Sequence, residues 1–200
     1  MRIGLLLAVV LLPSIVLGAD PNTKVIESPP SYTRRVAEFQ AILAKQPTRD
    51  AKVRKAVAMV ADSKSRYRLD AIDFLASVRA KEAVPTLIQV AKARNEREFA
   101  LHALGEIRDA RSVWPLIHYL SDPDENVRGN AYRSIERITK KSFPYRYDDS
   151  PMNRAKASQE IGLWWKAHEK TFKVQESTKE ESEEAARAWQ KYGQQYLLKH

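Results

Sequence analysis

The sequence predicts an all-α protein, a right-handed α-solenoid of antiparallel helix pairs with capping helices at both ends. Three observations favour this class. A pattern of apolar residues repeats along the centre of the chain, and within each copy the apolar spacing is helical. No run of strand length alternates between apolar and polar residues, so we expect essentially no sheet.

The composition is that of one packed domain with tails. The chain has 200 residues, of which 44% are hydrophobic and 30% are charged, so it can bury a sizeable core. It contains no cysteine, which excludes disulfides, thiolate zinc sites, iron–sulfur clusters and cysteine nucleophiles. Its stability must therefore come from packing alone.

The first 19 residues have the order of a secretory signal peptide. A basic start at Met1-Arg2 is followed by an apolar run over residues 3–12 and by small residues at Gly18-Ala19, where cleavage is expected. The alternative is an uncleaved anchor, but Pro13 interrupts an apolar stretch that is short for crossing about 30 Å of hydrocarbon. We expect export to the periplasm or the cell exterior, no transmembrane helix after cleavage, and a flexible linker over residues 20–31.

Residues 34–62 contain two helical stretches that match the later repeats only loosely. This region is predicted to be an amino-terminal cap within a solenoid that covers residues 32–170. Its apolar positions Val53, Val57 and Val60 have helical spacing, so we expect them to face the first repeat unit.

The central repeat is found by shifting residues 68–91 onto residues 97–120, which align without a gap. The matched residues are mostly apolar: Ala71 on Ala100, Ile72 on Leu101, Leu75 on Leu104, Val78 on Ile107, Val84 on Val113 and Leu87 on Leu116. A second shift continues the pattern, with Arg97 on Arg128, Ala100 on Ala131, Leu104 on Ile135 and Ile107 on Ile138. Each unit has two helical segments joined by a short polar turn. One helix pair cannot cover its own apolar faces, so neighbouring pairs are expected to stack.

Three segments carry a family resemblance. AVPTLI at residues 83–88, ALHALGEIRD at 100–109 and SDPDENVR at 121–128 resemble HEAT repeats, closest to the short bacterial type also found in phycobilisome-lyase-like proteins. The resemblance covers residues 68–141. Residues 138–165 are similar to a closing segment of some exported bacterial HEAT proteins, in which a loop leads to a helix with a tryptophan pair. It implies that second helices line a concave face, with Gln89, Lys92, His118 and Tyr119 pointing outward there.

Two further helices are predicted after the repeats. Ser150-Pro151 is a favourable helix start, and this helix is expected to run to about residue 170 and close the end of the stack. Its broad face carries Ile161, Trp164, Trp165 and His168, and we expect the tryptophans to pack rather than bind a ligand. After a linker, a last helix is expected from Ser177, with an apolar stripe of Ala185, Ala188, Trp189, Tyr192 and Tyr196. The stripe packs on the solenoid or on another chain; if exposed, it is a docking surface.

Basic residues are concentrated between Arg34 and Arg68, where ten lysines and arginines stand against three acidic residues. Such an excess attracts phosphates, anionic lipid headgroups or acidic proteins, although a solvated helical face has the same composition. We expect a basic rim formed by Arg54, Lys55, Arg66 and Arg68. Aromatic residues are sparse in this stretch and the chain is expected to be exported, so we do not expect nucleic acid to be the partner.

The sequence contains no recognisable catalytic, cofactor or metal motif. The four histidines lack metal-ligand spacing, and GxSxG, Walker A and GxGxxG motifs are missing. Asp122, Asp124 and Glu125 lack the DxDxDG calcium pattern, and a turn with a helix cap explains them.

The predicted function is therefore a non-enzymatic HEAT-repeat scaffold for protein–protein interaction in the cell envelope or outside the cell, with no cofactor and no catalytic residue. One alternative is a peripheral binder of anionic membrane or polymer through residues 34–68. A second is an accessory subunit of an envelope enzyme, with His118 or the loop containing Tyr145 and Tyr147 near its site.

Overall fold

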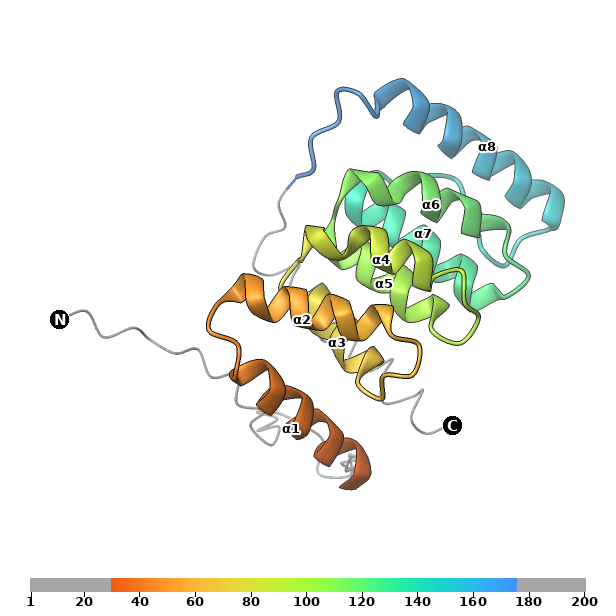
Figure 1. Ribbon diagram of the computed structural model, residues 1–200. Coiled ribbons are helices and arrows are strands. Elements are labelled where there is room, and N and C mark those ends of the chain that lie inside the picture. Colours follow the sequence, from red (N-terminus) through yellow and green to blue (C-terminus); the bar gives the residue numbers. More distant parts are fainter. Residues whose placement is uncertain (1–29, 176–200) are drawn as a thin grey trace, which may run out of the picture.

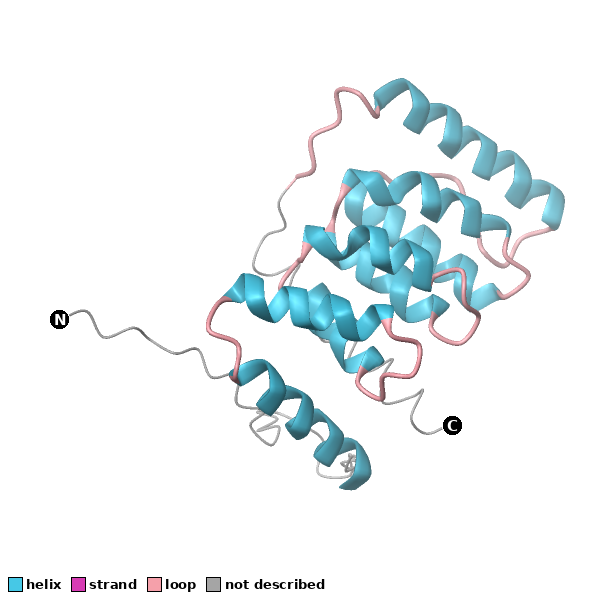
Figure 2. Ribbon diagram, viewed as in Figure 1, coloured by secondary structure: helices cyan, strands magenta, loops and turns pink. Residues whose placement is uncertain are grey.

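The computed structural model describes residues 30–175, and all regular structure in this stretch is helical (Figure 2). It has eight α-helices: α1 (Pro30–Ala44), α2 (Arg49–Ala61), α3 (Arg68–Ser77), α4 (Val84–Val90), α5 (Arg97–Ile107), α6 (Val113–His118), α7 (Glu125–Thr139) and α8 (Pro151–His168). Short 3-10 turns at Lys81–Ala83, Ala110–Ser112 and Tyr119–Ser121 flank α4 and α6. The predicted all-α class is confirmed for the described residues.

Two predicted segments lie outside the described residues. These are the signal peptide at residues 1–19 and the last helix from Ser177. The expected linker at 20–31 lies mostly outside as well, but its end does not. Helix α1 begins at Pro30, so the last two residues assigned to the linker are helical.

The helices form two layers (Figure 1). Helices α3, α5 and α7 lie side by side in one layer, where α5 contacts both neighbours. Helices α2, α4, α6 and α8 follow one another across the other layer, with direct contacts between α2 and α4 and between α6 and α8. At one end α1 packs on α2 and α3, and at the other end α8 packs on α6 and the turn after it.

Local capping explains where several helices begin. Thr48, Asp124 and Ser150 precede α2, α7 and α8, and each side chain accepts a hydrogen bond from a backbone N–H of the first turn. Pro151 occupies the first turn of α8, where its missing N–H is not needed. The predicted caps at the 121–125 turn and at Ser150 are therefore confirmed, and α8 ends at His168, two residues before the expected end.

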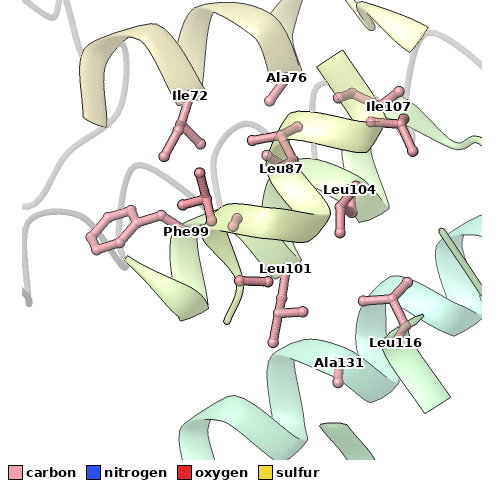
Figure 3. Close-up of a cluster of buried hydrophobic side chains, with 14 of the residues drawn as sticks. Ile72, Ala76, Leu87, Phe99, Leu101, Leu104, Ile107, Leu116 and Ala131 are labelled. Atoms are coloured by element: carbon pink, nitrogen blue, oxygen red, sulfur yellow. The ribbon is translucent and has the colours of Figure 1, made fainter. Parts of the chain in front are cut away.

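The core is built from the apolar positions that the repeat superposes. Fully buried side chains include Ile72, Leu75, Leu87, Leu101, Leu104, Ile107 and Leu116, and Figure 3 shows how most of them gather between the layers. Burying one such side chain is worth about 1.5–3 kcal/mol. In the predicted amino-terminal cap, Val53 and Val60 are buried and Val57 is half-buried against the same core.

Helices α5 and α7 approach each other closely at Gly105. The Ser134 hydroxyl of α7 donates a hydrogen bond of 2.9 Å to the Leu101 carbonyl of α5, one turn before Gly105. A Cβ atom at position 105 would lie 2.7 Å from Cβ and 2.9 Å from Cα of Ser134. Glycine is therefore the residue that permits this helix crossing.

The tryptophan pair of α8 packs as predicted. Trp165 is buried, and Trp164 is half-buried between Phe143 and His168, with ring centroids 5.2 and 4.6 Å away. Ile161 is also buried, while His168 is exposed beyond its stacked ring. This face of α8 covers the end of the core.

Candidate binding surface

Three arginines that the repeat superposes lie in the first turns of α3, α5 and α7. Each guanidinium donates hydrogen bonds to backbone carbonyls in the segment that precedes its helix. The bonds join Arg68 to Val60, Arg97 to Ala91 and Arg128 to Asp122, at 2.8, 2.9 and 2.9 Å. They satisfy carbonyl groups at helix ends and turns that have no partner within a helix.

The same arginines also bind residues that come later in the chain. Arg68 pairs with Glu96 at 3.4 Å, Arg97 pairs with Asp122 at 2.8 Å, and Arg128 donates to the Tyr147 carbonyl at 2.8 Å. Each arginine therefore joins the segment before its helix to a segment that comes later in the chain. We call Arg68, Arg97 and Arg128 the arginine ladder.

Arg68 was expected on an exposed basic rim, and the structure places it elsewhere. Its side chain is 13% exposed and lies between the end of α2 and the start of α5. The physical reason is that a guanidinium can bind a carbonyl and a carboxylate at once, and these two bonds hold it between the two helices. The repeat alignment contained the signal, because Arg68 recurs as Arg97 and Arg128 in register with core residues.

The four residues predicted on second helices lie at the end of α4 and the end of α6. Gln89, Lys92 and His118 are exposed, and Tyr119 is half-buried. We call these four residues the α4–α6 row.

Arg97 links the two halves of the row. Its Nη2 donates to the Lys92 carbonyl at 3.1 Å, and its guanidinium lies 5.5 Å over the centroid of the Tyr119 ring. The His118 ring meets Tyr119 edge-on, with centroids 5.5 Å apart. Gln89 joins the group through its carbonyl, which accepts from the Lys92 N–H. Burial raises the pKa of Tyr119, so its hydroxyl stays protonated near neutral pH. The row is thus three exposed groups and a half-buried tyrosine around a fixed arginine.

Half of the basic residues between positions 34 and 68 are paired with carboxylates. The pairs are Arg34 and Arg66 with Glu38, Arg35 with Asp70, Arg49 with Glu82, and Arg68 with Glu96. The other five, Lys45, Lys52, Arg54, Lys55 and Lys64, form no ion pair with a carboxylate in residues 30–175. Within the expected rim, Arg54 and Lys55 are therefore the available cations, while Arg66 is held by Glu38 and by the Tyr67 ring.

Arg54 borders a groove of about 530 Å³ between α2 and the turn before α4. Its lining residues are Asp50, Val53, Arg54, Val57, Ala58, Ala61 and Glu82, and we call it the α2 groove. Four of these residues are apolar and three, Asp50, Arg54 and Glu82, are charged. Lys55 follows Arg54 by one residue, a rotation of about 100° around the helix, and does not line the groove.

A smaller cleft of about 340 Å³ lies between α7 and the loop that contains Tyr145 and Tyr147. The Tyr145 hydroxyl is buried and donates to the Leu120 carbonyl at 2.5 Å, and burial raises the pKa of Tyr145. Tyr147 is 39% exposed. The proton of Tyr145 forms a structural bond that fixes the loop to the 3-10 turn after α6, so this phenol is poorly placed for acid–base chemistry.

His102 lies in a buried polar cluster on the α5–α7 side that sequence reasoning did not find. Its Nδ1 lies 3.3 Å from Nη1 of Arg137, and the same Nη1 lies 3.0 Å from Oε1 of Glu106. Burial, followed by the positive charges of Arg137 and Arg133, lowers the pKa of His102 well below its usual value. The imidazole is therefore neutral in the folded protein. Arg137 lies 35 residues further along the chain than His102, too far for local spacing to reveal the contact.

The described part of the chain offers no group of three or more histidine, aspartate or glutamate side chains arranged to hold a metal ion. Within the same residues, none of the helices has the length and apolar character needed to cross a membrane. Comparison of the chain with protein-family models, curated proteins and solved structures gave no match.

Proposed function

We propose that this chain is an exported, non-enzymatic scaffold: a short right-handed α-solenoid of antiparallel helix pairs, of the HEAT-repeat kind, that binds another protein. The arginine ladder is the observation that carries the proposal. An arginine at the same repeat position joins each of three helices to the segment before it and to a later segment, which is the kind of recurring contact expected between stacked equivalent units. The two layers of helices and the buried repeat positions also support it.

The α4–α6 row is the surface we propose for the partner. It combines an aromatic ring, an amide, an imidazole and an ammonium at the ends of two helices that are anchored by the core. Arg97 holds Tyr119 in place before any partner arrives, so less side-chain freedom is lost on binding. Tyrosine is enriched among residues that dominate binding energy at protein interfaces.

A second candidate is an anionic membrane or polymer, bound through the unpaired cations around α2. Lys45, Lys52, Arg54, Lys55 and Lys64 support this candidate because they carry charge that no described carboxylate neutralises. Binding of this kind depends on long-range attraction, which salt screens. At about 1 M salt the screening length is about 3 Å, so such binding is lost.

The two candidates are separated by affinity capture from an envelope extract, with washes at about 0.1 M and about 1 M salt. The bound material is identified by mass spectrometry. The variants are His118→Ala/Tyr119→Ala on the row and Arg54→Gln/Lys55→Gln on α2, which serve as matched controls for each other. Far-UV circular dichroism checks that both remain helical.

If the scaffold proposal is correct, we expect one protein to remain bound through the high-salt wash. Its recovered amount should fall about tenfold or more with the row variant and be unchanged with the α2 variant. Recovery at low salt alone, with loss in the α2 variant and none in the row variant, would reject the proposed surface in favour of the anionic one.

A further inference from the structure

The smaller cleft, between α7 and the loop that follows it, is lined by tyrosines and by charged residues of both signs. Tyr132, Arg133 and Glu136 of α7 line it together with residues 145–148 of the loop. We call it the tyrosine cleft. Its volume of about 340 Å³ is at the lower end of the range for ligand pockets, so it has room for one small ligand.

The loop of the tyrosine cleft is fixed by contacts although it has no regular structure. Tyr145 is buried, with its ring 5.0 Å from the ring of Tyr132. Tyr132 in turn donates to the Phe143 carbonyl at 2.7 Å, and Arg128 donates to the Tyr147 carbonyl at 2.8 Å. The loop is therefore in place before a ligand arrives, which reduces the freedom lost on binding.

Several groups of the cleft remain available to a ligand. The Tyr147 ring is 39% exposed, and its hydroxyl forms no hydrogen bond within residues 30–175. The Arg133 guanidinium binds the Asn130 side chain at 3.1 Å and has no carboxylate partner in the same residues. Arg146 and Asp148 form an exposed pair joined by two bonds of 3.2 and 3.0 Å.

Gly129 leaves space between two of these groups. A Cβ atom at position 129 would lie 3.5 Å from both Nη atoms of Arg133 and 3.6 Å from Cγ of Tyr147. The guanidinium and the phenol ring therefore border the same small gap. One ligand can contact both of them.

The charges of the cleft restrict the class of ligand. Two arginines stand against two carboxylates, so the lining has no net charge. An anion would meet the two carboxylates, a cation would meet the two guanidinium groups, and a wholly apolar ligand would take all four charged groups out of water. A neutral ligand with an apolar face and several hydroxyl groups avoids each of these costs.

A saccharide has these properties. The C–H groups on one face of a sugar ring can pack on the electron-rich face of an aromatic ring. Neighbouring sugar hydroxyls both donate and accept hydrogen bonds, so they match the paired groups of a guanidinium or a carboxylate. We propose that the tyrosine cleft binds one neutral sugar unit, with its ring on Tyr147 and its hydroxyls on Arg133 and on the pair of Arg146 and Asp148. The site shares no residue with the α4–α6 row and goes beyond the function proposed above.

Two-dimensional ¹H–¹⁵N NMR of the full chain tests this proposal. The sugar probes are methyl α-glucoside, methyl α-mannoside and N-acetylglucosamine, and sodium acetate and tetramethylammonium chloride are the charged controls. One small ligand with few contacts is expected to have a Kd of about 1 mM. We expect at least one sugar to cause saturating shifts of amides in residues 129–136 and 145–148, and neither charged control to do so.

Three variants separate the cleft from other surfaces, with far-UV circular dichroism to check folding. Tyr147→Ala is expected to weaken sugar binding about tenfold, and Tyr147→Phe, which keeps the ring, by less than about threefold. Arg133→Gln, which leaves the loop intact, should weaken it about threefold or more. The matched control is Trp114→Ala, which removes another exposed ring that does not line the cleft and should leave binding unchanged.

The absence of saturating shifts with all three sugars would overturn the proposal. Saturation by acetate at the same amides would also overturn it, because the cleft would then be an anion site. A loss in Trp114→Ala as large as that in Tyr147→Ala would place the sugar elsewhere. The measurement involves no partner protein, so its result is independent of whether the α4–α6 row binds one.

Discussion

Replacing Gly105 by alanine tests the close crossing of α5 and α7. The new Cβ would lie 2.7 Å from Cβ and 2.9 Å from Cα of Ser134, well inside ordinary contact distance. A rotamer change at Ser134 cannot relieve the contact with Cα, so α7 itself must move. That movement also pulls on the hydrogen bond from Ser134 to the Leu101 carbonyl, which is 2.9 Å long and buried.

The expected magnitude comes from three opposing contributions. Alanine in a helix is favoured over glycine by about 1 kcal/mol. Overpacking a tight contact costs about 1–3 kcal/mol, and weakening a buried hydrogen bond costs about 1 kcal/mol. We expect a net loss of about 2 kcal/mol, which lowers Tm by about 4–8 °C for a chain of this size.

The assay is urea unfolding monitored by far-UV circular dichroism, with Gly162→Ala as the matched control. At Gly162 the new Cβ would meet Cζ3 of Trp114 at 3.7 Å, an ordinary contact, so this variant should be as stable as the wild type or slightly more stable. If Gly105→Ala proves as stable as Gly162→Ala, α5 and α7 do not cross at Gly105 as described.

Three further predictions concern a buried histidine, the arginine ladder and a helix end. Because the pKa of His102 is lowered in the folded state, the unfolded chain takes up a proton first as the pH falls below about 6.5, and stability drops by up to about 1.4 kcal/mol per pH unit. Urea unfolding between pH 8 and 5 should show a steeper loss for the wild type than for His102→Gln, and equal slopes would contradict the burial of a neutral imidazole. Arg97→Lys keeps the charge but cannot bind two carbonyls and a carboxylate together, so we expect a loss of about 2 kcal/mol in urea unfolding, against less than about 0.5 for Arg49→Lys. Lys140 ends α7 with φ of 54°, so Lys140→Gly should raise the unfolding free energy by about 1 kcal/mol, and a loss would show that the lysine side chain outweighs the backbone strain.

The parts of the structure that the sequence predicted well depend on residues close together in the chain. The helical spacing of apolar residues identified the buried positions, such as Leu75 and Leu104, because one face of a helix must meet the core. The caps at Asp124 and Ser150 followed from the same kind of local rule, since each side chain binds the next turn.

The charged contacts could not be predicted from residues close together in the chain. Arg35 binds Asp70 at 2.9 Å and Arg137 binds Glu106 at 3.0 Å, across helices that are distant in sequence. A count of charges between residues 34 and 68 therefore overstated the available positive surface. Arg68 was assigned to an exposed basic rim, although it lies between the end of α2 and the start of α5. What a single sequence lacks is the set of long-range partners, and these decide which charges are exposed.

The arginine ladder also has a direction. Each arginine binds one set of partners earlier in the chain and another set 19–28 residues later in the chain. Each of these helices can therefore form its backward bonds without the rest of the chain, but its forward bonds need the segment that follows. Arg128, the last residue of the arginine ladder, donates to the carbonyl of Tyr147, so the ladder ends at the loop before α8.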